Sequence, residues 1–359
     1  FTSNAIGRYA NLHLLRQATI FHRAMPIFVG IMLFDNHQRP ISYLRLAVTD
    51  RCNLRCFYCM PEEGIRYVPK KHLLTFEEIE RLVRLVAGMG ISKVRVTGGE
   101  PFVRNDLMKL LRVLKSIPGI EHVHLTTNGV LTAPHVPELK AMGIASVNLS
   151  LDTLDRQRFH DITRRDEFDR VWETFEALLE YQIPVKLNAV VMDGKNIDDI
   201  LPLADLTRRF PVSVRFIEEM PFNGEGQHYP VLQWTHAKIL STLKAAYPGL
   251  SSKAPVPHAT AQEFQVPGHP GVLGIIAAFS RTFCGTCNRI RLTAQGELKT
   301  CLYDNGVMNL RDLMRSGKSD EELKRSLLDA FSHRPKDGFE AESRRGDLSV
   351  IESMSTIGG

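Results

Sequence analysis

The feature that most constrains this chain is a loop of three cysteines, Cys52, Cys56 and Cys59, in the spacing C-x3-C-x2-C. No fourth cysteine lies nearby and the nearest histidine is His72, so the loop supplies three soft ligands rather than a closed set of four. Structural zinc sites almost always use four protein ligands. A four-iron cluster held by three cysteines keeps one iron open for a small molecule. The loop therefore favours a reactive iron–sulfur cluster, with a zinc knuckle that borrows a distant fourth ligand as the alternative.

The other three cysteines form a second group near the carboxyl end of the chain. Cys284, Cys287 and Cys301 follow the spacing C-x2-C-x13-C. Three thiols again leave one coordination position of a four-iron cluster open. A zinc site completed by His269 or His333 is the alternative for this group.

Two arginines follow the second cysteine group directly. Arg289 and Arg291 are two residues apart, so in an extended segment both side chains project to the same face. Paired guanidinium groups suit bidentate binding of phosphate. The pattern predicts an anionic ligand that touches the second metal centre.

The charge and hydropathy of the chain are ordinary for a globular protein. Lys and Arg total 45 and Asp and Glu total 40, a net charge of +5 over 359 residues. This small excess argues against a nucleic-acid-coating role but permits a locally basic pocket. No apolar run approaches the roughly 18 residues of a membrane span, and nothing in the sequence favours disulfides. We therefore expect metal-bound cysteines in a reducing compartment, with no nucleic-acid or membrane partner.

The first 31 residues differ in composition from the rest. They contain Arg8, Arg16 and Arg23 and no acidic residue, which is typical of a mitochondrial transit peptide. Met32 directly precedes the first expected strand. We expect residues 1–31 to be an extension outside the fold and the protein to be cytoplasmic, with the mitochondrial matrix as the alternative if the extension is a transit peptide.

Strand and helix patterns alternate from Ile41 onward. Thr75 and Glu78 have the order of a capping box, and an apolar stripe of helical period follows them. Six βα repeats imply a parallel sheet whose carboxyl-end loops carry the site, although periodicity alone leaves a doubly wound sheet open. We expect strands at 42–48, 93–97, 122–126, 146–151, 185–191 and 213–217, and helices at 107–115, 168–181, 197–209 and 236–246.

The alternation stops at about residue 249. Residues 251–270 are rich in Pro, Ser and Ala, which indicates a linker or an irregular cover. Residues 274–280 are expected to form a short apolar strand that leads into the second cysteine group. We therefore divide the chain into an extension (1–31), a partial barrel (32–250) and a carboxyl-terminal region (251–359).

The first cysteine loop, with Tyr58 just before its last cysteine, resembles the signature of the radical S-adenosylmethionine (SAM) superfamily. The resemblance implies an incomplete (βα)6 barrel with a [4Fe-4S] cluster whose open iron chelates SAM and reduces it to a 5′-deoxyadenosyl radical. The run from Gly98 to Pro101 is similar to the glycine-rich motif that binds the SAM amino group; taken alone it indicates only a tight turn. By the same resemblance the SAM contacts are Tyr58, Gly99, Ser150 and Met220.

A more specific family resemblance rests on the second cysteine group, Arg289, Arg291 and the terminal Gly358 and Gly359. From about Phe34 to the end the chain resembles the radical SAM family that opens molybdenum cofactor biosynthesis by cyclising GTP. The resemblance implies two [4Fe-4S] clusters, held by Cys52, Cys56 and Cys59 and by Cys284, Cys287 and Cys301. It implies that the glycine tail reaches the active site and that GTP is bound by Arg45, Arg95, Thr126, Lys186, Arg289 and Arg291.

The strand positions of these basic residues support the list. Arg45, Arg95 and Lys186 lie within apolar strands, where a buried cation is costly without an anionic partner. The alternatives are that they extend to solvent or pair with Glu100 or Glu218. No Walker-type phosphate loop occurs, so side chains would have to hold the triphosphate.

The family resemblance also implies a reaction and partners. The adenosyl radical takes the ribose 3′ hydrogen of GTP, the carbon radical attacks guanine C8, and reduction gives 3′,8-cyclo-7,8-dihydro-GTP. The first cysteine group, Arg289 and Arg291 are the catalytic set. Cyclic pyranopterin monophosphate synthase would act next, flavodoxin or ferredoxin are candidate electron donors, and a homodimer is left open. A radical SAM peptide-modifying enzyme with an auxiliary cluster is the alternative, and a zinc-binding module without chemistry is the rival of a different kind.

Overall fold

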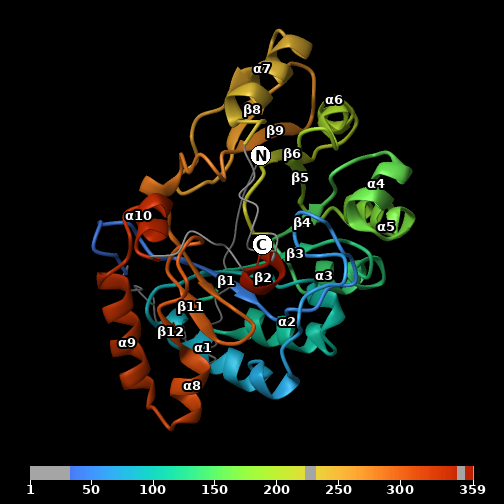
Figure 1. Ribbon diagram of the computed structural model, residues 1–359. Helices are drawn as coiled ribbons and strands as arrows, with labels where there is room; N and C mark the ends of the chain where they lie inside the picture. Colours follow the sequence, from blue (N-terminus) through green and yellow to red (C-terminus); the bar gives the residue numbers. More distant parts are fainter. Residues whose placement is uncertain (1–32, 223–231, 346–351, 359) are drawn as a thin grey trace, which may run out of the picture.

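The computed structural model describes residues 33–222, 232–345 and 352–358 (Figure 1). The extension predicted for residues 1–31 and the terminal Gly359 lie outside these described residues, so the predictions made for them stay predictions.

A single curved sheet organises the fold, and its central eight strands run parallel. The first six strands are side by side in chain order, because each is joined to the next by a connection that crosses the outer face. The predicted alternation of strands and helices is confirmed. The six strands are β1 (Tyr43–Ala47), β2 (Lys93–Thr97), β3 (His122–Thr127), β4 (Ser146–Ser150), β5 (Val185–Val191) and β6 (Ser213–Glu218).

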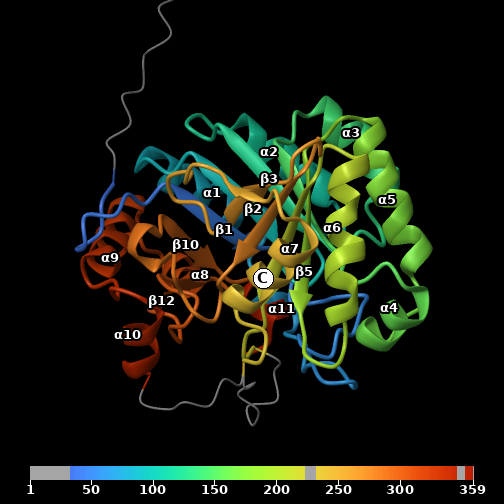
Figure 2. The same ribbon diagram turned by 90° about the horizontal axis from the view of Figure 1, so that it is seen from above.

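Helices cover the outer, convex face of this sheet (Figures 1 and 2). The capping box predicted at Thr75 is present, since the Glu78 amide donates to Thr75 Oγ1 at 3.2 Å and the Thr75 amide donates to Glu78 Oε2 at 2.8 Å. The short helices α3 and α4 were not predicted. The set is α1 (Phe76–Gly88), α2 (Leu107–Ser116), α3 (Val136–Ala141), α4 (Arg156–Thr163), α5 (Phe168–Glu180), α6 (Ile200–Arg209) and α7 (His236–Ala246).

The alternation of side chains along each strand decides what the two faces of the sheet do. Residues such as Leu44, Leu46 and Val94 point outward and are fully buried against the helices. Their neighbours point to the concave face, where polar and basic side chains line a cavity. The core therefore lies between sheet and helices, and the concave face is free to carry a site.

The carboxyl-terminal part of the chain adds strands to both edges of the parallel sheet. Strand β9 (Val272–Ile276) pairs with β6, and β10 (Arg289–Leu292) pairs with β1, both in parallel. Short antiparallel strands continue each edge: β8 (Gln262–Gln265) and β7 (Ser251–Ser252) beyond β9, and β11 (Glu297–Lys299) and β12 (Met308–Asn309) beyond β10.

Two predictions for this region need correction. Residues 251–270 are not simply an irregular cover, because β8 pairs with β9 and satisfies its outer backbone groups. The strand expected at 274–280 instead spans Val272–Ile276. The division at residue 250 stays a prediction. The remaining helices are α8 (Leu310–Arg315), α9 (Asp320–Ser332), α10 (Gly338–Ser343) and α11 (Met354–Ile357).

Candidate active site

A cavity of about 630 Å³ opens on the concave face of the sheet. Side chains at alternate strand positions and the loops that follow the strand ends form its wall. Every residue to which the sequence assigned a role in binding metal, SAM or GTP lines it. They are Arg45, Cys52, Cys56, Tyr58, Cys59, Arg95, Gly99, Thr126, Ser150, Lys186, Met220, Cys284, Cys287, Arg289, Arg291 and Cys301.

The first cysteine loop follows β1 and is fixed by backbone hydrogen bonds to the end of α4. The amides of Arg55 and Phe57 donate to the carbonyls of Thr163 and Ile162 at 2.9 and 3.1 Å. The Leu54 amide points at Cys52 Sγ from 3.4 Å. These contacts place the loop at the carboxyl end of the barrel strands, where the sites of βα barrels are formed.

Burial is the largest influence on the pKa values of the first cysteine group. Burial, reinforced by Glu100, raises the pKa of Cys52 to about 12. Burial likewise raises the pKa of Cys59 to about 11, although Ser353 opposes it. Thiols in this environment need a strong positive partner to ionise.

Tyr58 is held beside the first cysteine group by a buried carboxyl group. Its hydroxyl donates to Asp152 Oδ2 at 2.8 Å, and the Val190 amide donates to Asp152 Oδ1 at 2.8 Å. Asp152 comes two residues after Ser150, so one strand end supplies both groups. Asp152 was not predicted, because a carboxyl group after a strand is a weak signal by itself.

Close packing requires glycine at positions 98 and 99 at the end of β2, in addition to the predicted contact with SAM. A Cβ at Gly99 would come within 2.3 Å of the Arg51 carbonyl oxygen, and one at Gly98 within 2.6 Å of the Thr49 carbonyl oxygen. Only glycine lets this turn approach the backbone that leads into Cys52 so closely. Contact of Gly99 with SAM stays a prediction.

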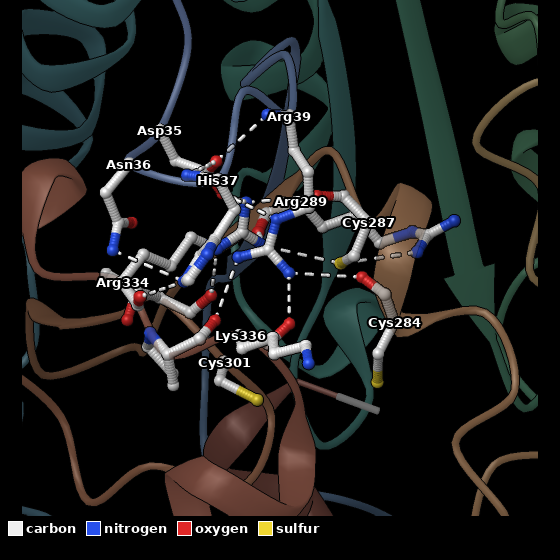
Figure 3. A network of polar contacts seen from close by, with 12 residues as sticks. Asp35, Asn36, His37, Arg39, Cys284, Cys287, Arg289, Cys301, Arg334 and Lys336 are labelled. Carbon is white, nitrogen blue, oxygen red and sulfur yellow. Dashed lines mark hydrogen bonds and ion pairs between the residues drawn. The ribbon is translucent and has the colours of Figure 1, made fainter.

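The second cysteine group lies among buried charges (Figure 3). Arg334 donates to Cys287 Sγ at 3.3 Å, to the Arg289 carbonyl at 2.7 Å and to Asp35 Oδ2 at 3.1 Å. Arg39 also pairs with Asp35, at 2.7 Å, and donates to the Cys284 carbonyl at 3.1 Å. The loop at residues 35–39 and the segment after α9 therefore meet at this group.

The electrostatics of this second group differ from those of the first. Burial opposes ionisation of Cys287, but Arg334 and Arg289 outweigh it and lower its pKa to about 7. Burial raises the pKa of Cys301 to about 12. Positive charge therefore gathers around Cys287, on the side of the second group where Arg289 and Arg291 lie, as the predicted anionic ligand would require.

The zinc alternatives for the two groups find no support in their geometry. His269 shares a hydrogen bond with Thr207 at 2.9 Å and packs against Tyr247, and His333 is exposed beside Asp329. Neither histidine lines the cavity. Over the described ranges, no three His, Cys, Asp or Glu side chains converge as closely as a single metal ion needs.

The donor set fits thiolate-held iron–sulfur clusters. Each group offers three unpaired cysteines on the cavity wall, and N–H groups point at the sulfurs of Cys52 and Cys287. Three thiols per group are the number that leaves one iron open.

Basic side chains form the part of the wall between the two cysteine groups. Register pairs Arg291 with Arg45 and Arg45 with Arg95 across β10, β1 and β2. Lys186 lies further round the barrel, in register with Asn148. Arg289 and Arg291 both line the cavity from β10, so their predicted common direction is confirmed.

Glu100 and Glu218, the carboxylates of the predicted alternative, are engaged elsewhere. Glu100 accepts from the amides of Phe102 and Asn128 and from the Thr127 hydroxyl. Glu218 accepts from His236 and Ser280. The predicted alternative, in which they pair with Arg45, Arg95 or Lys186, is therefore wrong for Glu100 and Glu218.

Orphaned polar atoms in the wall also indicate a polar ligand. Thr126 Oγ1, Asn148 Oδ1 and Asn188 Oδ1 are buried and have no hydrogen-bond partner within the described part of the chain. The three side chains come from adjacent strands and all line the cavity. Because unsatisfied buried polar groups are costly, this wall is suited to a ligand rich in hydroxyl and amide groups.

The carboxyl tail reaches the same basic wall. The Gly358 carbonyl accepts from Arg291 Nη1 at 3.1 Å and from Arg45 Nε at 3.3 Å. Gly358 has a φ of +75°, and a Cβ there would come within 2.9 Å of Thr97 Cγ2. The prediction that the tail approaches the site agrees with this geometry for Gly358.

Some wall residues were missed in the sequence, for two different reasons. The alternation rule that places Arg45 and Arg95 inward also places Tyr43 and Lys93 inward, and Arg215 on β6 follows it too. Strand alternation alone therefore indicates these three positions. Arg334 belongs to an irregular segment far along the chain, where no local pattern indicates that it is buried.

Comparison with known proteins matches two family models to this chain. The Radical SAM superfamily model covers residues 46–207, and the Molybdenum Cofactor Synthesis C model covers residues 212–340. Among solved structures, Streptococcus suis SuiB aligns over 86% of this chain and 69% of its own, with a TM-score of 0.60 at 15% identity. At that identity the likeness concerns the fold alone.

Curated relatives are much more similar in sequence. GTP 3′,8-cyclase from Heliobacterium modesticaldum is 43% identical over 335 residues, which cover 91% of this chain and 100% of the relative. Molybdenum cofactor biosynthesis protein 1 from Bos taurus is 44% identical over 296 residues, or 82% of this chain. The chain spans about half the length of the latter, namely 47%.

The fold and the first cysteine loop define a radical SAM protein. This class carries SAM and a [4Fe-4S] cluster. Within it, the chain belongs to the GTP 3′,8-cyclase family. The described part of the chain contains no helix with the length and hydropathy of a membrane span.

Proposed function

We propose that this protein cyclises GTP to 3′,8-cyclo-7,8-dihydro-GTP, the first step of molybdenum cofactor biosynthesis. One observation supports this above others: both cysteine groups and the basic wall between them face the same cavity. The family assignment agrees with it. A cavity lined by so many cations suits a nucleotide triphosphate better than the peptide of the alternative hypothesis.

The residues divide the cavity into two ends. Cys52, Cys56 and Cys59 would hold the first cluster, and Tyr58 and Ser150 stand beside it for SAM. Bound there, SAM and the cluster would supply the 5′-deoxyadenosyl radical for hydrogen abstraction from the ribose.

At the other end, Cys284, Cys287 and Cys301 would hold a second cluster near the guanine. Arg45, Arg95 and Lys186 would orient the triphosphate so that the ribose faces the first end, which converts an encounter into a positioned reaction. Thr126 would donate a hydrogen bond to the nucleotide. Arg289 and Arg291 would stabilise negative charge beside the second cluster.

Anaerobic reconstitution tests the function directly. The purified protein should bind about eight irons with matching sulfide, since each cluster holds about four. Incubated with SAM, a reductant and GTP, it should form the cyclised nucleotide and 5′-deoxyadenosine. SAM cleavage without any cyclised product from GTP would overturn the proposal.

The basic wall predicts that nucleotide binding depends on pH. Burial, then the neighbouring Arg215, Arg95 and Lys93, lowers the pKa of Lys186 to about 8. Lys186 is therefore charged below pH 8 and becomes neutral as pH rises through 8. We expect the affinity for inorganic triphosphate, measured by calorimetry, to fall between pH 7 and pH 9.

Lys186→Gln isolates this contribution. The variant should bind triphosphate about tenfold more weakly at pH 7, from the loss of one charged hydrogen bond. Its affinity should approach that of the wild type at pH 9, where the lysine is neutral. Lys244→Gln, on the exposed face of α7 outside the cavity, is the matched control and should change neither value. A constant ratio between wild type and Lys186→Gln across this range would contradict the assignment.

A further inference from the structure

Six inward-facing side chains form a two-by-three grid on three adjacent strands of the basic wall. In the upper row Arg291, Arg45 and Arg95 are in register, and in the lower row Arg289, Tyr43 and Lys93 are in register. All six line the cavity. Five members of the grid are cations, and the central position of the lower row is a tyrosine.

Tyr43 contacts the cation on each side of it in the lower row and one, Arg95, diagonally in the upper row. Arg95 Nε donates to its hydroxyl at 2.6 Å. Lys93 Nζ lies 4.6 Å from the ring centre, and Arg289 Cζ lies 5.8 Å from it. Both distances are within the range of cation–π attraction. A single buried side chain, 6% exposed, therefore touches three of the five cations.

Carboxylates do not neutralise these three cations. Over the described residues no Asp or Glu forms a salt bridge with Lys93, Arg95 or Arg289. The nearby Arg215, which also lines the cavity, pairs with Glu263 at 3.3 Å. Like charges in a low-dielectric site repel one another strongly. An anionic group at the centre of the grid would therefore stabilise the charged forms of Lys93, Arg95 and Arg289.

We propose that Tyr43 is a positioning residue for the nucleotide: it holds Lys93, Arg95 and Arg289 in place, and its phenolate oxygen takes up a proton when the polyphosphate binds. The phenol is the one member of the grid that can become an anion. In the free protein its oxygen accepts a hydrogen bond from Arg95. A bound polyphosphate replaces it as the counter-charge, and the phenolate then accepts a proton from water.

The charges around Tyr43 set the direction of this exchange. Burial alone would raise its pKa, but Arg95, Arg45 and Lys93 outweigh burial and lower it to about 7. An anion bound to the same cations moves the pKa back up, so binding takes up a proton at pH above 7. The charged groups that face the phenol are Arg45, Lys93, Arg95, Arg215, Arg289 and Arg291, with Glu263 paired to Arg215.

Calorimetry with the reconstituted two-cluster protein tests the inference. GTP is titrated at pH 7.5 and pH 8 in two buffers of different ionisation enthalpy, which gives the number of protons taken up. Tyr43→Phe keeps the ring and its cation–π contacts but removes the hydroxyl. The variant should take up roughly half to one proton fewer than the wild type, and its affinity should depend less on pH.

Tyr67→Phe is the matched control, because Tyr67 also lies beside two arginines, Arg51 and Arg55, but outside the cavity lining. It should leave proton uptake unchanged. Equal proton uptake by wild type and Tyr43→Phe would overturn the inference. Should Tyr43→Phe not fold, Lys186→Gln decides instead, because it removes the lysine as a proton acceptor; absence of uptake in that variant at pH 8 would overturn the inference.

The inference rests on the proposed function for its ligand, and the two can fail separately. If GTP does not bind the wild-type protein at all, the proposed function fails. If GTP binds and is cyclised while Tyr43→Phe behaves as the wild type, only the role of Tyr43 fails.

Discussion

Cys56→Ser and Cys287→Ser are expected to separate the two halves of the reaction. Each variant should lose about half of the iron, or roughly four atoms per chain. Cys56→Ser should show no cleavage of SAM, because the first group would hold the cluster that reduces SAM. Cys287→Ser should still cleave SAM to 5′-deoxyadenosine, but should form no cyclised nucleotide.

The reason lies in the chemistry of the ligands and the separation of the two groups. Serine oxygen is a poor substitute for a thiolate at a soft metal centre. Each variant leaves the three cysteines of the other group unchanged, so each variant is the control for the other. Iron and sulfide analysis, with separate assays of 5′-deoxyadenosine and of product, gives the readout. If Cys287→Ser kept its first cluster intact but no longer cleaved SAM, the prediction that the two clusters act separately would be wrong.

Gly358→Ala is expected to lower the turnover rate on the order of 100-fold, while the free energy of unfolding falls by only about 1 kcal/mol. A Cβ at this position would come within 2.9 Å of Thr97 Cγ2 and 3.2 Å of Ala47 Cβ, so the tail must move. Movement withdraws the Gly358 carbonyl from Arg45 and Arg291. Displacements of about 1 Å in a positioned site can cost on the order of 100-fold in rate.

Gly268→Ala is the matched control for backbone strain. Gly268 has a φ of +79°, close to the +75° of Gly358, but a Cβ there meets nothing within 4 Å. Both substitutions should therefore cost about 1 kcal/mol in the free energy of unfolding. Turnover, measured as cyclised product per enzyme, should fall only in Gly358→Ala; an equal fall in both variants would assign the effect to strain alone.

Local sequence patterns predicted the barrel well, and for physical reasons. The capping box at Thr75 and the alternating strands are short-range signals, so their elements appear where expected. Cysteine spacing and the i, i+2 relation of Arg289 and Arg291 are likewise local, and these residues meet at one cavity.

Apart from Tyr43, Lys93 and Arg215, which strand alternation indicates, the parts that were missed depend on long-range contacts. β8 has a weak pattern of its own and forms because the outer edge of β9 needs a partner. Arg334 is buried only because Asp35 and the second cysteine group surround it, almost 300 residues and about 45 residues away along the chain. The buried Asp152 that holds Tyr58 is also a tertiary pairing, across 94 residues.

The attachment of β9 and β10 to opposite edges of the barrel has a consequence for biogenesis. Until these late segments are synthesised, β1 and β6 are bare edge strands with unpaired backbone groups, the kind of surface that promotes aggregation. The strands that follow α7 thus complete the sheet, and the segments around them supply three cysteines. A chain that stops before these segments would therefore expose both edges, and a cluster held by the second group could be inserted only after Cys301 has been synthesised.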